Sequence, residues 1–136
     1  MDNVERIRRL YEAWSAGDLD TAIAGMDPDV EWLEPADSPD ARAWRGAEGI
    51  VASMEKWTEP FEDFGFAIVE MVPAGERVLV QLHQHARGRG SGAEVEGDIW
   101  HLWTLVDGKA VKAEMFSSRE EALAAAESPV HPGGAA

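Results

Sequence analysis

The sequence contains no cysteine in its 136 residues. Disulfides and thiolate chemistry are therefore excluded, and any metal ion would need histidine and carboxylate ligands. The absence of cysteine is also compatible with a reducing compartment, and we expect a cytoplasmic protein. The first residues mix charges at helical spacing and lack the apolar segment of a signal peptide, so we predict no such peptide.

Basic residues are few, and long apolar runs are missing. Twelve Lys and Arg residues against 26 Asp and Glu residues give a formal net charge of -14. Because a polyanion would meet a repulsive field over most of the surface, we expect no nucleic-acid partner. No stretch approaches the roughly 18 apolar residues that a transmembrane helix needs, so we expect no membrane partner either.

The hydrophobic content of 45% is enough for one sizeable core. We therefore predict a single domain over residues 1–127. The last residues, 128–136, combine two prolines with a Gly-Gly-Ala-Ala end and are predicted to be a disordered tail.

Helical periodicity dominates the first half of the chain. Apolar residues recur at three- and four-residue steps from Val4 to Trp14, which predicts a helix that ends near Gly17. Asp18 can cap a second, short helix over residues 19–25. Three further elements are predicted: a short strand at residues 30–35, a loop at residues 36–42 that could lie over a pocket mouth, and a helix at residues 46–56.

From Phe61 onward the period changes from helical to two, which predicts strands. Asp107-Gly108 is a hairpin signal before the last of them. The strands are predicted around residues 64–68, 78–83, 99–104 and 110–117, and a closing helix at residues 119–127. Helices grouped ahead of a run of antiparallel strands indicate an α+β fold.

Several short motifs resemble a known family in their order and spacing. They are Ala-Gly-Asp-Leu at residues 16–19, Asp-Pro-Asp-Val-Glu-Trp at 27–32, Arg-Gly-Ala-Glu-Gly at 45–49 and Asp-Gly-Lys at 107–109. Over residues 4–127 the chain resembles the SnoaL-like and ketosteroid-isomerase-like proteins of the nuclear-transport-factor-2-like superfamily. The resemblance implies a strongly bent antiparallel sheet wrapped around the N-terminal helices, a cone-shaped pocket, and a homodimer.

The resemblance also suggests two catalytic positions, Glu34 and His101. Glu34 occupies the place of the aspartate that moves the proton in ketosteroid isomerases, and His101 the place of their oxyanion-stabilising aspartate. Burial among apolar groups would raise the pKa of the carboxylate toward that of a general base, and the histidine could donate to an enolate oxygen. The tyrosine partner of those enzymes aligns with Leu10, one residue before Tyr11. Alternatively, Glu34 ends a strand at the surface and His101 is a hydrogen-bonded residue of the sheet.

Large apolar residues supply the predicted substrate-binding wall. We expect it to consist of Tyr11, Trp14, Trp32, Trp44, Ile99, Trp103 and Met115, because aromatic rings suit a hydrophobic ligand. Among the tryptophans, Trp14 and Trp57 are expected in the core and Trp44 at the pocket mouth. Trp100 is expected on the sheet face opposite Trp103.

Three histidines raise the alternative of a metal site. His83 and His85 point to one face of a strand, and His101 lies on the next strand. A two-residue turn at residues 91–92 would pair His101 with residue 82, whereas one extra residue would pair it with His83 and let three imidazoles converge on a zinc ion. The apolar residues of the segment 78–82 compete for the inner face, so the sequence leaves open which face His83 and His85 occupy. We predict no metal and no cofactor.

Three functional hypotheses follow. The first is a small-molecule enzyme of the cyclase or isomerase type that moves a proton next to a carbonyl, with Glu34 as base and His101 as donor to the oxyanion. The second is a module that binds or stores an apolar small ligand without chemistry. The third is a dimerising scaffold whose sheet face docks a partner. In the first two, the partner is a hydrophobic small molecule.

Overall fold

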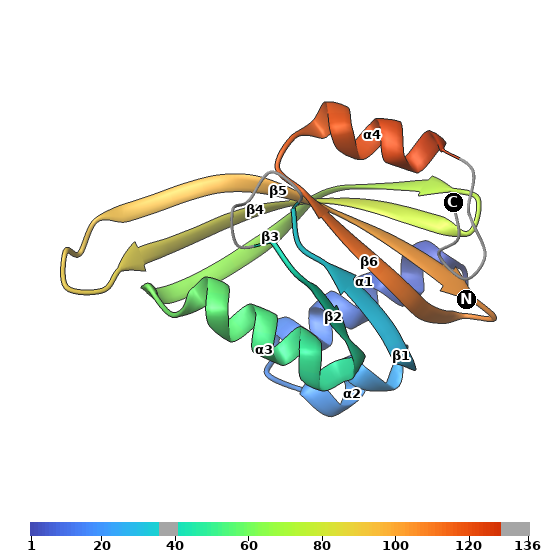
Figure 1. Ribbon diagram of the computed structural model, residues 1–136, viewed down its shortest axis with the longest axis horizontal. Helices are drawn as coiled ribbons and strands as arrows, with labels where there is room; N and C mark the ends of the chain where they lie inside the picture. Colours follow the sequence, from blue (N-terminus) through green and yellow to red (C-terminus); the bar gives the residue numbers. More distant parts are fainter. Residues whose placement is uncertain (36–40, 129–136) are drawn as a thin grey trace.

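The fold is a curved six-stranded sheet with helices on both faces, described by a computed structural model for residues 1–35 and 41–128 (Figure 1). Its elements follow the order α1 (Asn3–Ser15), α2 (Leu19–Ala24), β1 (Met26–Leu33), β2 (Ala43–Arg45), α3 (Gly46–Thr58), β3 (Phe61–Ala74), β4 (Arg77–Gly88), β5 (Glu94–Val106), β6 (Lys109–Phe116) and α4 (Arg119–Glu127). The predicted α+β class is confirmed. Most of the predicted loop at 36–42, and the predicted tail after Ser128, lie outside the described residues.

Local sequence signals account for the helix boundaries. In α1, α2 and α4 the residue before the helix accepts a hydrogen bond from the backbone N–H three residues later, at 2.8–3.2 Å; these caps are Asp2, Asp18 and Ser118. Gly17 follows the C-cap of α1 with φ 78°, a left-handed conformation that glycine adopts without strain. None of the described helices has the length and apolarity needed to cross a membrane.

The sheet has the strand order β2-β1-β6-β5-β4-β3. The predicted four-stranded meander corresponds to β3–β6, and its neighbours are all antiparallel. β1 pairs in parallel with β6, which corrects the expectation of a purely antiparallel sheet. The short strand β2 pairs with β1 and was not predicted, because three residues are too few to show an alternation. Asp107 and Gly108 both have positive φ, as a tight hairpin turn between β5 and β6 requires.

The register of β4 and β5 decides which side chains face inward. Val80 lies opposite His101 and Leu82 opposite Ile99, so these four residues share the inner face. A five-residue loop at 89–93 joins the two strands, so His101 pairs with Val80 and with neither of the predicted partners, residue 82 and His83. His101 nevertheless faces the same side of the sheet as the two-residue turn predicted, because residues 80 and 82 point to the same face.

Two clusters of buried residues lie on the two faces of the sheet. The inner cluster packs α1, α2 and α3 against the sheet, and its largest buried side chains are Trp32, Trp103 and Tyr11. The outer cluster packs α4 against Leu79 and Leu102, as the position of α4 across the sheet in Figure 1 shows. Trp100 packs against this outer cluster, which confirms that it lies on the face opposite Trp103.

Candidate functional site

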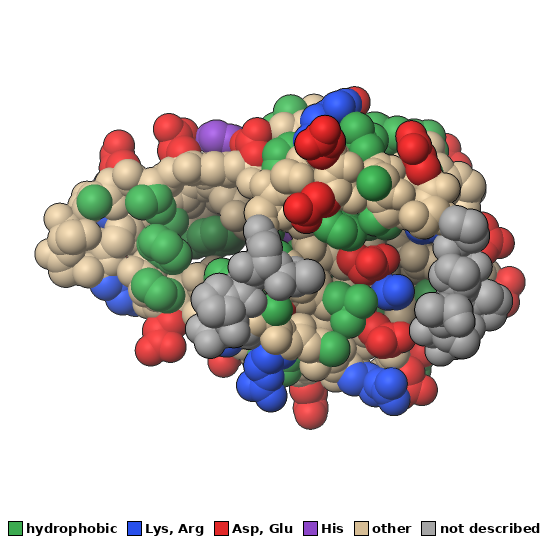
Figure 2. Space-filling model, turned by 45° about the horizontal axis from the view of Figure 1, so that its top comes forward, with side chains coloured by type: hydrophobic (Ala, Val, Ile, Leu, Met, Phe, Trp, Pro, Cys, Tyr) green, Lys and Arg blue, Asp and Glu red, His purple; other side chains and the backbone are tan. Residues whose placement is uncertain are grey.

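A predominantly apolar cavity of about 190 Å³ lies between the inner face of the sheet and helices α1 and α3. Figure 2 shows a hollow with hydrophobic side chains along its left side and in its depth. The wall consists of Tyr11, Trp14, Trp32, Pro35, Ser53, Met54, Trp57, Thr58, Phe61, Phe64, Phe66, Leu82, Gln84, Ile99, His101 and Met115. Among the described residues, no Asp, Glu, Lys or Arg lines this cavity. The wall therefore offers a ligand apolar contact and a few neutral polar groups.

Six of the nine predicted site residues lie on this wall: Tyr11, Trp14, Trp32, Ile99, His101 and Met115. Glu34, Trp44 and Trp103 do not. Trp103 is fully buried behind the wall, where its ring packs edge-on against Tyr11. Trp44 lies opposite Trp32 in the β1–β2 pair, and the guanidinium of Arg42 stacks on it at 4.3 Å. Trp44 is therefore not part of the cavity wall, to which it was assigned from the sequence.

Ten wall residues were not nominated from the sequence, among them Trp57, Phe66 and Gln84. Trp57 was expected in the core, but it is 39% exposed, so that prediction is wrong. Strand alternation could have found Gln84, because it lies two residues beyond the inward-facing Leu82. Phe66 lies opposite Gln84 on β3 and follows from the same parity.

A chain of hydrogen bonds between three aromatic side chains reaches the wall at His101. Trp103 Nε1 donates to the Tyr11 hydroxyl at 2.7 Å, and this hydroxyl lies 2.7 Å from His101 Nδ1. Because an indole can only donate, the tyrosine keeps its own proton to donate, and His101 Nδ1 is the acceptor within reach. The network thus assigns His101 the tautomer with its proton on Nε2.

Burial keeps this chain neutral. It lowers the pKa of His101 to about 4 and raises the pKa of Tyr11 above its ordinary value. His101 Nε2 has no hydrogen-bond partner among the described residues, and neither has Nε1 of the wall residue Trp14. A buried donor without a partner costs about 1–3 kcal/mol, so an acceptor on a ligand would be stabilised there.

Tyr11 lies on the cavity wall, whereas Leu10, with which the resemblance aligns a tyrosine, does not. Leu10 is a buried core residue and does not line the cavity. Tyr11 lines the cavity, and its hydroxyl lies 2.7 Å from His101 Nδ1. The sequence carries a signal for this choice, since Tyr11 is its only tyrosine.

Glu34 has a buried carboxylate that is held by four donors instead of facing the cavity. Oε1 accepts hydrogen bonds from the backbone N–H of Arg42 at 2.9 Å and from Lys56 Nζ at 2.7 Å. Oε2 accepts hydrogen bonds from Ser53 Oγ at 2.6 Å and Trp57 Nε1 at 2.8 Å. The side chain of Glu34 is fully buried, so it does not end the strand at the surface either.

The environment of Glu34 favours its charged form. Burial alone raises its pKa, but the hydrogen bonds from Lys56, Ser53 and Trp57 outweigh burial and lower the pKa to about 2. The raised pKa expected from the sequence is therefore wrong. A carboxylate of such low basicity, with both oxygens already bonded, is a poor proton acceptor. Its visible effect is to join the end of β1 to α3, because Ser53, Lys56 and Trp57 belong to that helix. Ser53 and Trp57 are also residues of the cavity wall.

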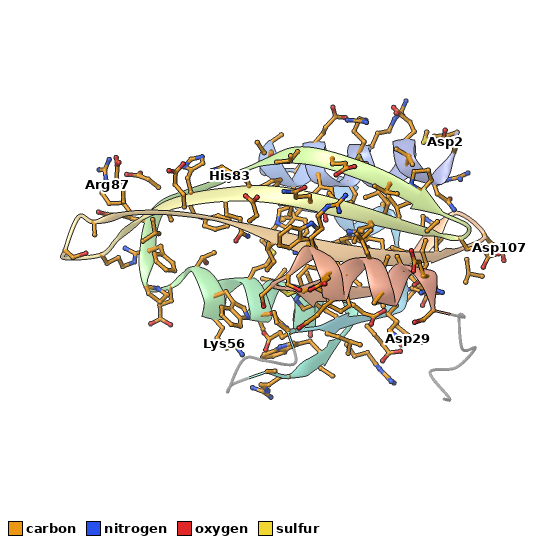
Figure 3. The ribbon with its side chains drawn as sticks, turned by 90° about the horizontal axis from the view of Figure 1, so that it is seen from above. Asp2, Asp29, Lys56, His83, Arg87 and Asp107 are labelled. Carbon is orange, nitrogen blue, oxygen red and sulfur yellow. The ribbon has the colours of Figure 1, made fainter. Side chains whose placement is uncertain are left out.

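His83 and His85 lie on the opposite face of the sheet from His101. His83 Nδ1 lies 2.6 Å from Asp98 Oδ1 and its Nε2 lies 3.1 Å from Glu96 Oε1, which together raise its pKa. Figure 3 shows His83 on the long hairpin and Lys56 on α3, on opposite sides of the molecule. The three histidines do not converge, and that alternative is wrong. Within residues 1–35 and 41–128, no cluster of three or more His, Asp or Glu side chains is placed to hold a metal ion.

Comparison with known proteins gives a family and a set of similar structures. The sequence profile of the SnoaL-like domain matches residues 7–113. No curated protein matches the chain.

Three solved structures illustrate the similarity. TerC, co-crystallised with polyporic acid, is 26% identical, with 93% of this chain and 98% of TerC covered at a TM-score of 0.73. An NTF2-like protein from Burkholderia thailandensis E264 is 25% identical over 95% of this chain and 99% of its own, with a TM-score of 0.77. A candidate SnoaL-like polyketide cyclase from Jannaschia sp. CCS1 is 24% identical over 94% and 93%, with a TM-score of 0.73, which shows a shared fold.

Proposed function

Since the chain belongs to the SnoaL-like domain family, we propose that its cavity binds an uncharged, hydrophobic small molecule through one carbonyl oxygen. That oxygen accepts a hydrogen bond from His101 Nε2. The observation that carries the proposal is the combination of an apolar wall with a histidine whose Nδ1 is occupied by Tyr11 and whose Nε2 is unpaired.

The chemistry of the wall supports a neutral ligand with an acceptor. A charged ligand would lose its hydration without meeting an opposite charge, because no ionised side chain of the described residues lines the cavity. A ligand without any acceptor would leave the His101 donor buried and unpaired. The volume corresponds to on the order of a dozen water-sized sites, which suits a molecule of one or two rings.

A matched pair of ligands tests this proposal. 2-Acetylnaphthalene carries a carbonyl oxygen, and 2-isopropenylnaphthalene has a CH₂ group in its place with nearly the same shape. The two dissociation constants, measured by tryptophan fluorescence, are compared between wild type and His101→Leu. The difference in hydration between the ligands is common to both proteins, so it cancels from the ratio of ratios.

We expect His101→Leu to weaken ketone binding, relative to hydrocarbon binding, by about tenfold, which is the loss of roughly one hydrogen bond. Trp14→Phe removes the other unpaired N–H of the wall and should weaken both ligands alike. An unchanged ratio in His101→Leu would sink the proposal, and a changed ratio in Trp14→Phe alone would move the donor to Trp14.

A second candidate function is chemistry of the cyclase or isomerase type at the same carbonyl. It is favoured by the family and by the donor on His101, which would stabilise an enolate oxygen as charge develops. In this proposal Glu34 supports the wall and is not the base, because its two oxygens already accept four hydrogen bonds. No described residue of the wall is a free base, so the acetyl proton would pass to a water molecule or buffer base that enters the cavity, and the His101 donor would stabilise the enolate left behind. The expected result is that the acetyl protons of 2-acetylnaphthalene exchange with deuterium faster with wild type than with His101→Leu. An equal rate would leave binding alone.

A further inference from the structure

Two polar groups of the cavity wall are used neither by the described part of the protein nor by the function proposed above: Nε1 of Trp14, which can only donate, and the side-chain amide of Gln84. The hydroxyls of Ser53 and Thr58 are committed, since Ser53 donates to Glu34 and Thr58 to the backbone carbonyl of Met54. The side-chain amide of Gln84 makes no hydrogen bond to any described residue, although Gln84 is half-buried. It offers both a donor and an acceptor to the cavity.

Gln84 stands far from His101 along the sheet. His101 lies opposite Val80 on β4, and Gln84 is four residues further along the same strand on the same face. At a rise of 3.3–3.4 Å per residue, the two backbone positions are separated by about 13 Å along the strand direction. His101 and Gln84 therefore lie at different ends of the cavity wall.

The neighbours of Gln84 leave room for a ligand atom beside its amide. Its partner across the β4–β5 pair is Gly97, which has no side chain, and a Cβ built there would meet no atom within 4 Å. Its partner on β3 is Phe66, an aromatic residue of the wall. A ring packed against Phe66 can thus place a polar substituent next to the amide.

We propose that the ligand is a two-ended aromatic molecule, with the carbonyl at His101 and a hydroxyl or second carbonyl at the far end that hydrogen-bonds to Gln84. This inference rests on the function proposed above and specifies its ligand class. Gln84 is then the residue that selects the far substituent, and His101 the residue that binds the carbonyl.

The test adds one hydroxyl to the probe used above. 6-Acetyl-2-naphthol has the acetyl group of 2-acetylnaphthalene and a hydroxyl at the opposite end of the rings. The gain in affinity from the hydroxyl is measured in wild type, in Gln84→Leu and in Gln81→Leu. Gln81 is a matched control, because it lies on the same strand but bonds to Asp98 on the outer face.

We expect the hydroxyl to improve binding three- to tenfold more in wild type and in Gln81→Leu than in Gln84→Leu. Gln84→Glu keeps an acceptor for the hydroxyl and should retain part of the gain. Equal gains in wild type and Gln84→Leu would overturn the inference.

The two proposals fail separately. If His101→Leu abolishes the ketone preference while Gln84→Leu has no effect, carbonyl binding stands and the far-end contact falls. If the reverse is found, Gln84 binds a polar group but the placement of the carbonyl is wrong, and the inference falls with it.

Discussion

Two buried polar clusters adjoin the cavity and differ in how completely their hydrogen bonds are used. Around Glu34, four donors meet two carboxylate oxygens, and all of this capacity is spent inside the protein. Around His101, Tyr11 and Trp103, one nitrogen of a wall residue is left over. The difference teaches that a buried charge can be purely structural, whereas unused hydrogen-bonding capacity beside a cavity points to a ligand.

The largest predicted effect tests whether Glu34 stabilises the fold. Glu34→Gln turns an NH₂ group toward groups that themselves donate, and it removes the charge that Lys56 faces. We expect the free energy of unfolding, measured in urea, to fall by about 3–4 kcal/mol, near the lower end for a broken buried pair because Lys56 is about one third exposed.

Glu55→Gln is the matched control for this change. Glu55 is an exposed residue of the same helix, so its substitution should change the free energy of unfolding by less than about 0.5 kcal/mol. The comparison breaks if both variants are equally stable. The ketone-to-hydrocarbon ratio should be the same in Glu34→Gln as in wild type.

A slightly smaller effect is expected from the titration of His101. Its pKa is about 4 in the folded protein and near 6.5 when unfolded, so the unfolded chain binds more protons between these values. The contribution of His101 to the free energy of unfolding is fully present above pH 6.5, and about 2–3 kcal/mol of it is lost as the pH drops to 4. Glu34, with a pKa lowered to about 2, adds a further loss from about pH 4.5 downward.

Urea unfolding at several pH values measures this loss. In His101→Phe the part between pH 6.5 and 4 should disappear, while the loss below pH 4.5 should stay. A pH profile identical to that of wild type would show that His101 is not buried in its neutral form.

Removing the hydroxyl of Tyr11 has a more moderate expected effect. Tyr11→Phe leaves the indole N–H of Trp103 and Nδ1 of His101 without their partner, which should cost about 1–2 kcal/mol of stability. Long-range ¹H–¹⁵N NMR at pH 7 should show a bare Nδ1 and a protonated Nε2 at His101 in wild type. The variant should show a mixture of tautomers. A protonated Nδ1 in wild type would contradict the assigned hydrogen-bond direction.

The smallest effect sharpens the comparison between the two faces of the sheet. His83 has a pKa raised by Asp98 and Glu96, so by NMR it should titrate above 6.5 while His101 shows no change above pH 5.5. Asp98→Asn should bring the pKa of His83 back toward its ordinary value. The stability should hardly change, because exposed ion pairs contribute little. If both histidines titrated at the same pH, the predicted difference between the paired His83 and the buried His101 would be wrong.

Much of the fold follows from local patterns in the sequence. The alternation from Phe61 onward predicts the meander, and Asp18 and Asp107-Gly108 predict a helix start and a turn. These signals act over a few residues, so a sequence displays them directly. The parallel pairing of β1 with β6 depends on contacts between distant segments, and no local pattern indicates it.

The site was predictable where a regular period decides which side a residue faces. Strand alternation gives Ile99 and His101, and helical spacing gives Tyr11 and Trp14 of α1. Trp103 lies on the same sheet face as His101 but is covered by Tyr11. Glu34 was misjudged because its environment comes from Ser53 and Trp57, which α3 brings close from about twenty residues away. A carboxylate among apolar residues suggests a raised pKa, until the donors around it are known.

The parallel pairing of β1 with β6 also affects how the protein reaches its native state. Trp32 lies opposite Ala113, so this wall of the cavity joins the early and late parts of the chain. Contacts of such long sequence separation slow folding, because a long loop must close before they stabilise anything. During synthesis, β1 can pair with β2 early, but the side of Trp32 that faces β6 stays open until β6 has left the ribosome.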